Sequence, residues 1–351
     1  MSIEINQRKI GPGQPCFIIA EAGGNHNGEI SLARELVDAA CDTGVDAIKF
    51  QTYITEKVTT DYTPKATYQK HNTGEEESFI EMGRRLELTY DEFAELQAYC
   101  TSKGVLFLST PFDFDSATFL HERLDIPLFK ISSGDVTTLP FLAHIAGFGK
   151  PVILSTGMAN LGEVEAAVRT IFIAGCPELI LLQCVSNYPA APEDVNLRAM
   201  DTMARAFRVP IGYSDHVSTN EVAFAAVALG ACVIEKHYTL DRDMPGPDHQ
   251  ASLLPHELKA LVEGIRKVEV SLGSGVKMPA ALEAETAMVS RRSLVAARPL
   301  DVGHVLKSED MILLKPGTGL PASFASHLVG RALRKPLRTN EQLSLDVFTD
   351  A

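Results

Sequence analysis

The stretches PIGYSDH (residues 210–216), NEVAFAAVALG (220–230) and VIEKHY (233–238) follow one another closely in the chain. The first and the third are short apolar runs that end in polar or charged residues. The second begins at an asparagine, stops at a glycine and is long enough for a helix. This order predicts a strand, a helix and another strand.

Six earlier runs have the same character, and each is followed by a stretch that could form a helix. They are FIIAEA (17–22), AIKFQ (47–51), VLFLST (105–110), LFKISS (128–133), PVILST (151–156) and LILLQC (179–184). Eight strand-and-helix units in succession are typical of an α/β fold, the TIM (β/α)₈ barrel, whose active site lies at the carboxyl ends of the strands. The polar residues expected at that mouth are Glu21, Lys49, Gln51, Thr110, Lys130, Ser133, Ser155, Ser186, Ser214, His216, Glu235 and His237.

The chain has 351 residues, more than the roughly 250 that a TIM barrel needs. We therefore expect a barrel over residues 1–275, a linker over 276–289 and a small second domain over 290–351. The last segment contains short strand-like runs separated by the turns PLDVG and PGTGLP. A domain of roughly 60 residues is marginally stable by itself, so we expect it to pack on a barrel, its own or that of a partner.

The connection from residue 53 to residue 88 is longer and more polar than the others, and it contains an acidic run at residues 75–77. A long loop between a barrel strand and its helix is often a lid or a substrate-binding element. A solvated excursion without a binding role is the other interpretation of this segment.

The composition of the chain limits the partners and the cell compartment that we expect. A formal net charge of −13 argues against nucleic acid or an anionic membrane as a partner. The start of the chain lacks the apolar core of a secretory signal, and no apolar stretch reaches the roughly 20 residues that cross a bilayer. The six cysteines have no paired spacing, which is typical of free thiols in a reducing compartment. We therefore expect a soluble, cytoplasmic protein.

Within this acidic chain, Lys49, Lys130 and Lys236 lie near predicted strand ends, and we expect all three in the mouth. A lysine there needs an anion, because an unpaired buried ammonium costs several kcal/mol. The anion can be a bound ligand or a carboxylate of the protein, and both interpretations stay open for each lysine. Together the three indicate an anionic small molecule, for which the nearby hydroxyl groups would be donors.

His216 and His237 follow or end neighbouring strands, so both imidazoles would reach the same rim. With an adjacent carboxylate, Glu235 or Asp248, they could hold a divalent metal and leave positions for water and substrate. A single histidine beside a strand is more often structural, and this is the role we expect for His26. Two histidines at adjacent strand ends indicate a site.

Several motifs run in order along nearly the whole chain: AEAGGNHNG, KFQT, STPFD, KISSGD, LSTGM, QCVSNYP, GYSDH, EKHYTLDRDMPGPDH and, in the small domain, RRSLVAA with KPGTG. In these motifs the chain resembles the bacterial sialic acid synthase family, the phosphoenolpyruvate-dependent synthases of nine-carbon nonulosonic acids. The tail resembles the antifreeze-like (SAF) domain that such synthases carry after the barrel.

The resemblance implies a transferase that condenses phosphoenolpyruvate with an open-chain N-acetylated hexosamine and releases phosphate. It implies that His216 and His237 ligate Mn²⁺ or Mg²⁺, and that Glu21, Asp135 and Glu235 handle protons or water. Phosphoenolpyruvate would be bound by Lys49, Thr110, Lys130, Ser133, Ser155, Ser186 and Ser214. The sugar would be bound by Gln51, Tyr188, Asp248 and Lys315, the last reaching in from the partner subunit of a domain-swapped homodimer.

Two positions depart from the family pattern. Ser186 stands where sialic acid synthases often have asparagine, and Lys315 stands where they have an arginine that recognises the N-acetyl group of the sugar. Lysine lacks the planar fork of arginine, so this exchange is not neutral. The departures leave the reaction unchanged and the sugar open: either N-acetylmannosamine or a 2,4-diacetamido-trideoxyhexose, which would give legionaminic acid.

Two other functions are compatible with parts of the sequence. A Schiff-base aldolase of a related sugar acid would use one of the lysines, and borohydride would trap it with its substrate. A non-catalytic barrel that binds sugar acids would show eroded metal and lysine positions, whereas this chain retains all of them.

Overall fold

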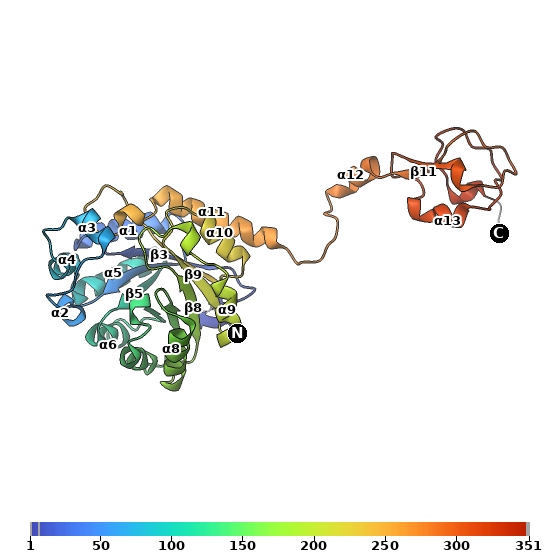
Figure 1. Ribbon diagram of the computed structural model, residues 1–351. Helices are drawn as coiled ribbons and strands as arrows, with labels where there is room; N and C mark the ends of the chain where they lie inside the picture. Colours follow the sequence, from blue (N-terminus) through green and yellow to red (C-terminus); the bar gives the residue numbers. More distant parts are fainter. Residues whose placement is uncertain (1, 6–7, 349–351) are drawn as a thin grey trace. The chain divides into compact units, whose positions relative to one another are not determined.

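The computed structural model of the chain describes residues 2–5 and 8–348. It divides into two compact units, Met1–Gly273 and Ser274–Ala351. The first unit holds a parallel sheet surrounded by helices, and the second is a small unit of short strands, turns and helices (Figure 1).

The first unit is built on eight parallel strands. They are β3 (Phe17–Gly23), β4 (Ala47–Thr52), β5 (Leu106–Pro111), β6 (Phe129–Ile131), β7 (Val152–Ser155), β8 (Leu179–Cys184), β9 (Ile211–Asp215) and β10 (Val233–His237). Their order is β5-β4-β3-β10-β9-β8-β7-β6. The outermost two, β5 and β6, also lie against each other, so the sheet curves into a near-closed barrel. The predicted TIM barrel is confirmed.

Helices follow the strands and cover the outside of the barrel. The main ones are α1 (Ile30–Cys41), α5 (Tyr90–Lys103), α6 (Phe114–Glu122), α7 (Leu139–Ala146), α8 (Leu161–Ile173), α9 (Ala199–Phe207), α10 (Glu221–Ala228) and α11 (Pro255–Leu272). Residues 53–88, here called the lid segment, carry three shorter helices between β4 and α5. These are α2 (Thr55–Val58), α3 (Thr67–Thr73) and α4 (Phe79–Leu86).

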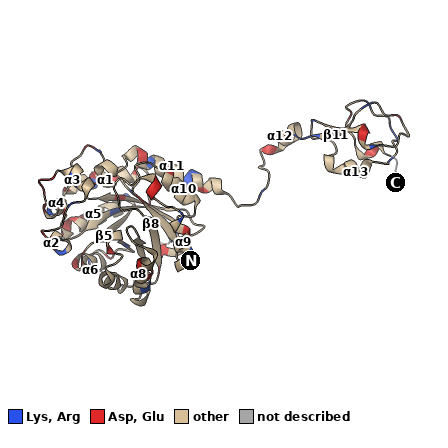
Figure 2. Cartoon of the chain, viewed as in Figure 1, with Lys and Arg blue, Asp and Glu red and all other residues tan. Residues whose placement is uncertain are grey.

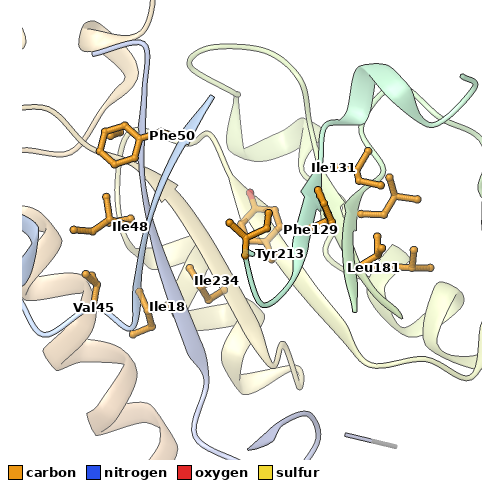
Figure 3. Close-up of a cluster of buried hydrophobic side chains, with 14 of the residues drawn as sticks. Ile18, Val45, Ile48, Phe50, Phe129, Ile131, Leu181, Tyr213 and Ile234 are labelled. Atoms are coloured by element: carbon orange, nitrogen blue, oxygen red, sulfur yellow. The ribbon is translucent and has the colours of Figure 1, made fainter. Parts of the chain in front are cut away.

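Alternation along the strands produces two apolar layers. One set of side chains, including Ile18, Ile48 and Ile234, points outward and packs against the helices (Figure 3). The other set, which includes Ile19 and Val233, fills the barrel interior. Residues of both layers are almost completely buried, because both faces of a barrel sheet are covered.

A short antiparallel hairpin, β1 (Ile3–Ile5) with β2 (Arg8–Ile10), precedes the barrel and was not expected from the sequence. Ile3, Ile5 and Ile10 belong to the same apolar cluster as the interior residues Phe17 and Val233, which begin β3 and β10. The hairpin therefore closes the barrel at the amino ends of its strands, opposite the mouth.

The second unit has a core of its own. Strand β11 (Ser293–Ala296) pairs antiparallel with β12 (Met311–Leu314), and α13 (Ala325–Leu328) follows. The buried apolar residues are Leu294, Ala296, Leu300, Leu306, Leu328, Leu333, Leu337, Leu343, Val347 and Phe348. The segment expected to be a linker, residues 276–289, contains most of a short helix, α12 (Glu283–Ser290).

Among the residues that the structure describes, no helix is both long and apolar enough to cross a membrane. The outer helices of the barrel unit contain both acidic and basic residues (Figure 2). This mixture fits surface helices whose apolar stripe faces the sheet.

Candidate active site

The carboxyl ends of the strands bring the predicted polar residues into the barrel interior. Glu21 on β3 is in register with Lys49 on β4 and with His237 on β10. Glu235 is in register with Ser214 on the other neighbouring strand. Because these residues share the inward phase of the alternation, their side chains meet at one mouth.

Two lysines and two glutamates form a buried charged cluster at this mouth. Lys49 Nζ lies 2.6 Å from Glu21 Oε2, 3.0 Å from Thr110 Oγ1 and 3.9 Å from Glu235 Oε2. Lys130 Nζ lies 3.4 Å from Glu235 Oε1. The exposed fractions of these four charged side chains are between 1% and 6%. Each lysine therefore has a carboxylate partner within the protein.

Burial and charge perturb these groups in opposite directions. Burial raises the pKa of Glu21 to about 7, although the Lys49 ammonium opposes the shift. Burial would also raise the pKa of Glu235, but Lys130 and Lys49 outweigh it and hold this pKa below its usual value. The two carboxyl groups thus differ in proton affinity, an arrangement typical of sites that move protons.

Hydroxyl groups line the side of the mouth formed by β6, β7 and β8. Ser133 Oγ accepts a hydrogen bond from the Gly157 backbone N–H, at 2.9 Å. A Cβ at Gly157 would lie 2.4 Å from Ser186 Oγ and 3.0 Å from Ser133 Oγ, so glycine is needed for the two hydroxyls to converge. Ser155 Oγ is buried and has no hydrogen-bond partner among the described residues. Such unpaired hydroxyls can donate to an anion.

Asp135 ends the 3₁₀ turn Ser133–Asp135. Burial raises its pKa to about 6, and Lys130 opposes this shift. A carboxyl group with this pKa can hold a proton or release it near neutral pH.

The two candidate metal ligands lie side by side, with ring centroids 5.4 Å apart. His216 Nδ1 is 2.7 Å from the carbonyl oxygen of Val185. Because a carbonyl only accepts, Nδ1 carries a proton, so in the neutral imidazole the lone pair is on Nε2. Burial would lower the pKa of His216, but the nearby Cys184 and the bond to Val185 outweigh it and raise this pKa above its ordinary value. His237 Nδ1 is buried without a partner in the described part of the chain. Burial and the neighbouring His216 hold the pKa of His237 well below its ordinary value, so this imidazole is neutral.

The structure describes no group of three His, Cys, Asp or Glu side chains that could hold a metal ion by themselves. Among the described residues, neither Glu235 nor Asp248 therefore completes a set of three ligands with the two histidines. The two imidazoles still offer lone pairs in a buried, polar setting. This donor set fits a divalent ion that takes its other ligands from water or substrate.

A cavity of about 280 Å³ opens beside His237. Its polar wall includes Gln51, Tyr188, His237 and Asp248, and burial raises the pKa of Asp248 to about 6. The ring of Tyr188 lies 4.1 Å from that of His216, between centroids. Three predicted sugar-binding residues thus surround one cavity next to the predicted metal ligands.

Most of the other lining residues come from the lid segment, and they include several apolar and aromatic side chains. The lining residues there include Tyr53, Val58, Tyr68, Phe79, Met82 and Leu86. Asn72 Nδ2 donates to the carbonyl oxygen of Pro247 at 2.7 Å, and the ring centroid of Tyr68 lies 5.2 Å from that of Tyr188. The lid segment therefore lines the cavity and contacts loops of the barrel mouth, as the interpretation as a lid or substrate-binding element predicts.

One predicted mouth lysine, Lys236, lies outside this constellation. Lys236 was expected in the mouth, but the alternation that points Glu235 and His237 inward points Lys236 outward, where it pairs with Asp215. Lys315 is exposed and lies in the second unit. His26 is buried and accepts a hydrogen bond from the Gly28 backbone N–H, as expected for a structural histidine.

Cys184 is a mouth residue that the sequence analysis missed. It ends β8 in the inward phase, and its Sγ lies 3.8 Å from His216 Nδ1. The same alternation rule that selected Lys49 and Glu235 would have selected it. The Val185 carbonyl, which fixes the tautomer of His216, had no sequence signal because any residue supplies a backbone carbonyl.

A larger cavity, of about 480 Å³, lies at the other end of the barrel and is lined by Arg8, Phe17 and Asp46, among others. Phe17 begins β3, so this cavity lies near the amino ends of the strands. None of the predicted site residues lines it. The mouth is therefore the better candidate for the active site.

An eight-stranded TIM barrel with this buried set of lysines, carboxylates and histidines at its mouth defines a barrel enzyme. Comparison with known proteins gives its kind: the NeuB family model matches residues 36–277, and the SAF domain model matches residues 291–348. The chain belongs to the NeuB family of sialic-acid-type synthases, and it carries a SAF domain at its carboxyl end.

Individual relatives cover nearly the whole chain. The N,N'-diacetyllegionaminic acid synthase of Legionella pneumophila is 45% identical over 95% of this chain and 94% of its own length. The human N-acetylneuraminate-9-phosphate synthase is 38% identical over 92% of this chain and 90% of its own. A crystal structure of the N-acetylneuraminic acid synthetase from Leptospira borgpetersenii, in complex with citrate, matches with a TM-score of 0.72 and 38% identity. It covers 82% of this chain and 95% of that one.

Proposed function

We propose that this enzyme condenses phosphoenolpyruvate with an open-chain N-acetylated hexosamine, forms a nonulosonic acid and releases phosphate. The observation that carries the proposal is the meeting of Lys49 and Lys130 with His216 and His237 at one barrel mouth, next to a cavity of about 280 Å³. The lysines supply the charge that an anionic substrate needs, and the cavity offers room for a neutral one.

Phosphoenolpyruvate would bind over the hydroxyl-lined side of the mouth. Lys49 and Lys130 would bind its carboxylate and phosphate, each through a charge-assisted hydrogen bond. The hydroxyl groups would donate further bonds to the same oxygens. They belong to Thr110, Ser133, Ser155, Ser186 and Ser214. The unpartnered Ser155 Oγ supports this role, because a buried hydroxyl without a partner is costly until a ligand pairs with it.

The two imidazoles would hold Mn²⁺ or Mg²⁺. Support comes from the Nδ1 bond of His216 to the Val185 carbonyl, which leaves Nε2 as the nitrogen available to an ion, and from the neutral state of His237. When bound, the ion would polarise the aldehyde oxygen of the open-chain sugar. The orientation of the His216 ring is fixed by its hydrogen bond to Val185 and by the packing of Tyr188 against it.

The chemical steps need a nucleophilic carbon, a water molecule and proton carriers. Carbon 3 of phosphoenolpyruvate would attack the sugar aldehyde, whose oxygen takes up a proton. Water would then add to carbon 2 and lose one proton. The bond from carbon 2 to the phosphate oxygen would break as the new hydroxyl loses its proton, which leaves a keto group and releases phosphate. Glu21, Asp135 and Glu235 would carry these protons. The pKa of about 7 for Glu21 and of about 6 for Asp135 suit transfer near neutral pH.

Among the acceptors, a 2,4-diacetamido-trideoxyhexose suits the cavity better than N-acetylmannosamine. Gln51, Tyr188 and Asp248 would bind its polar groups. The apolar wall from the lid segment, with Val58 and Met82, would contact two acetamido methyl groups and the deoxy carbon. The relative at 45% identity, named as an N,N'-diacetyllegionaminic acid synthase, supports the same choice.

We further propose that the enzyme is a domain-swapped homodimer of the cytoplasm, in which Lys315 reaches the sugar in the partner's barrel. Apolar side chains of the second unit that are 37% to 40% exposed support a docking role. They are Ile312, Leu313, Leu314 and Phe324. All six cysteines are free, as suits a reducing compartment.

The test of the proposed function is phosphate release from phosphoenolpyruvate with a panel of N-acetylated hexoses. We expect release only with an acceptor, and the fastest release with 2,4-diacetamido-2,4,6-trideoxymannose. Faster release with N-acetylmannosamine would overturn the choice of sugar but not the reaction. Acceptor-independent release, or none with any sugar, would overturn the reaction itself. Trapping by borohydride would favour the Schiff-base aldolase instead.

A further inference from the structure

Lys236 is a buried charge that the proposed chemistry does not use. It lies on β10 between Glu235 and His237, points outward from the barrel interior and is 1% exposed. Its Nζ donates to Asp215 Oδ2 at 2.6 Å, to the carbonyl oxygen of Thr219 at 2.8 Å and to that of Val217. An ammonium has three donors, and all three are used.

The acceptors of Lys236 surround one of the predicted metal ligands. Asp215, Val217 and Thr219 belong to the end of β9 and the loop after it, and His216 lies between the first two. Asp215 Oδ1 in turn accepts from the Val217 backbone N–H at 2.9 Å and from the Tyr213 hydroxyl at 3.0 Å. The backbone on both sides of His216 is therefore held by one buried ion pair.

The same ion pair connects the two predicted metal ligands. Lys236 is the chain neighbour of His237, and its side chain reaches across to the segment that carries His216. The His216 ring is fixed separately, through its Nδ1 bond to Val185. Lys236 thus holds the backbone around His216 in place relative to β10. Its hydrogen bonds go to the β9 segment and not to either imidazole.

A buried ion pair is by itself weak evidence of a stabilising role. Removing two charges from water is expensive, and well-packed apolar residues often stabilise a protein as much as a buried ion pair does. A buried pair whose hydrogen bonds are all satisfied does, however, fix a loop in one conformation.

We propose that Lys236 is a positioning residue that sets the separation between His216 and His237. The inference rests on the proposed function, in which the two imidazoles share one divalent ion. Ring centroids 5.4 Å apart suit that task, and a loop after β9 freed from Lys236 would let His216 move away. Removal of Lys236 would therefore lower the affinity for the metal and leave the barrel folded.

The experiment measures Mn²⁺ affinity by electron paramagnetic resonance titration, without any turnover. We expect Lys236→Met to weaken Mn²⁺ binding by about 10- to 100-fold, the range seen when groups behind metal ligands are removed. Because this variant leaves Asp215 buried and unpaired, it can fail to fold. The double variant Asp215→Asn/Lys236→Met leaves neither charge of this pair without its partner and should show the same loss of affinity.

Asp46→Asn is the matched control. Asp46 is also mostly buried, pairs with Arg8 and Arg266, and accepts from the Ile18 backbone N–H, but it lies at the amino ends of the strands. We expect this variant to bind Mn²⁺ like the wild type, even if its melting temperature falls.

Three results would overturn the inference. In the first, folded Lys236 variants bind Mn²⁺ as the wild type does. In the second, Asp46→Asn loses as much affinity as they do, which would make the effect one of general stability. In the third, the wild type binds no Mn²⁺ at all, and this result alone would also overturn the metal part of the proposed function.

Discussion

Lys49 Nζ lies 2.6 Å from Glu21 Oε2, so the lysine expected to bind phosphoenolpyruvate already has a carboxylate partner. An incoming anion must share or displace that partner. When the ammonium turns to the anion, Glu21 loses part of the positive field that lowers its pKa. Substrate binding and the protonation of Glu21 should therefore be linked.

This linkage predicts proton uptake when phosphoenolpyruvate binds. The pKa of Glu21 is about 7 with Lys49 beside it, so the pKa must rise further when Lys49 pairs with the substrate. At pH 7.5 we expect uptake of about half a proton, measured by calorimetry in buffers of different ionisation enthalpy. Glu21→Gln should abolish this uptake. An unchanged uptake in Glu21→Gln would assign the proton to another group.

Replacing Lys49 or Lys130 by Met should affect one substrate more than the other. Each variant loses a charge-assisted contact of roughly 1.5–3 kcal/mol, so we expect the KM for phosphoenolpyruvate to rise about 10- to 150-fold. The KM for the sugar should change little. Steady-state kinetics with each substrate varied in turn checks this, and equal effects on both constants would make the lysines structural.

Asp248→Asn should stabilise the metal-free protein while raising the KM for the sugar. Burial raises the pKa of Asp248 to about 6, so the folded state holds this proton more tightly than the unfolded chain does. The contribution of Asp248 to stability therefore falls as pH rises from about 4 to about 6, and the full cost is present above that range. Asparagine avoids this cost, and we expect a gain of about 1–3 kcal/mol at pH 8.

Urea unfolding with EDTA at pH 5 and pH 8 measures this effect, with the exposed Asp243→Asn as the control in the same loop. The gain from Asp248→Asn should be larger at pH 8 than at pH 5, and the control should show none at either pH. A gain that is equal at both values would refute the assigned cause.

The barrel and most of its mouth could be predicted, because both follow from local rules. Apolar runs set the strands, and the period of two selects residues such as Lys49, Glu235 and His237 for the interior. The error with Lys236 came from neglecting that same period. Successive side chains of a strand point to opposite faces, so Lys236 cannot point inward when its neighbours Glu235 and His237 do. Its position near the end of a strand does not by itself place it in the mouth.

Other features depend on contacts between distant segments. The lid segment has no strong period, and its role became visible only where Tyr68 meets Tyr188 and Asn72 meets Pro247. The amino-terminal hairpin is too short for a clear alternation. The role of its isoleucines is evident only from the structure, in which they pack against the barrel interior.

The cross-subunit role of Lys315 predicts complementation between two weak variants. Mixing Lys315→Ala subunits with His237→Ala subunits should restore about one working site per heterodimer, because one barrel then receives an intact tail. Mixing wild type with the double variant should leave the heterodimer inactive. Activity from phosphate release, corrected for heterodimer content by native mass spectrometry, checks this. The opposite pattern would place Lys315 in its own barrel.

The central claim is that this barrel joins the carbon skeleton of phosphoenolpyruvate to that of an N-acetylated sugar. The most direct measurement is carbon-13 NMR of the reaction with phosphoenolpyruvate labelled at carbon 3 and 2,4-diacetamido-2,4,6-trideoxymannose. The account predicts that the label appears in a methylene group bonded to the former aldehyde carbon of the sugar, with one phosphate released per product. Label that remains in phosphoenolpyruvate, or that appears only in the methyl group of pyruvate, would contradict it.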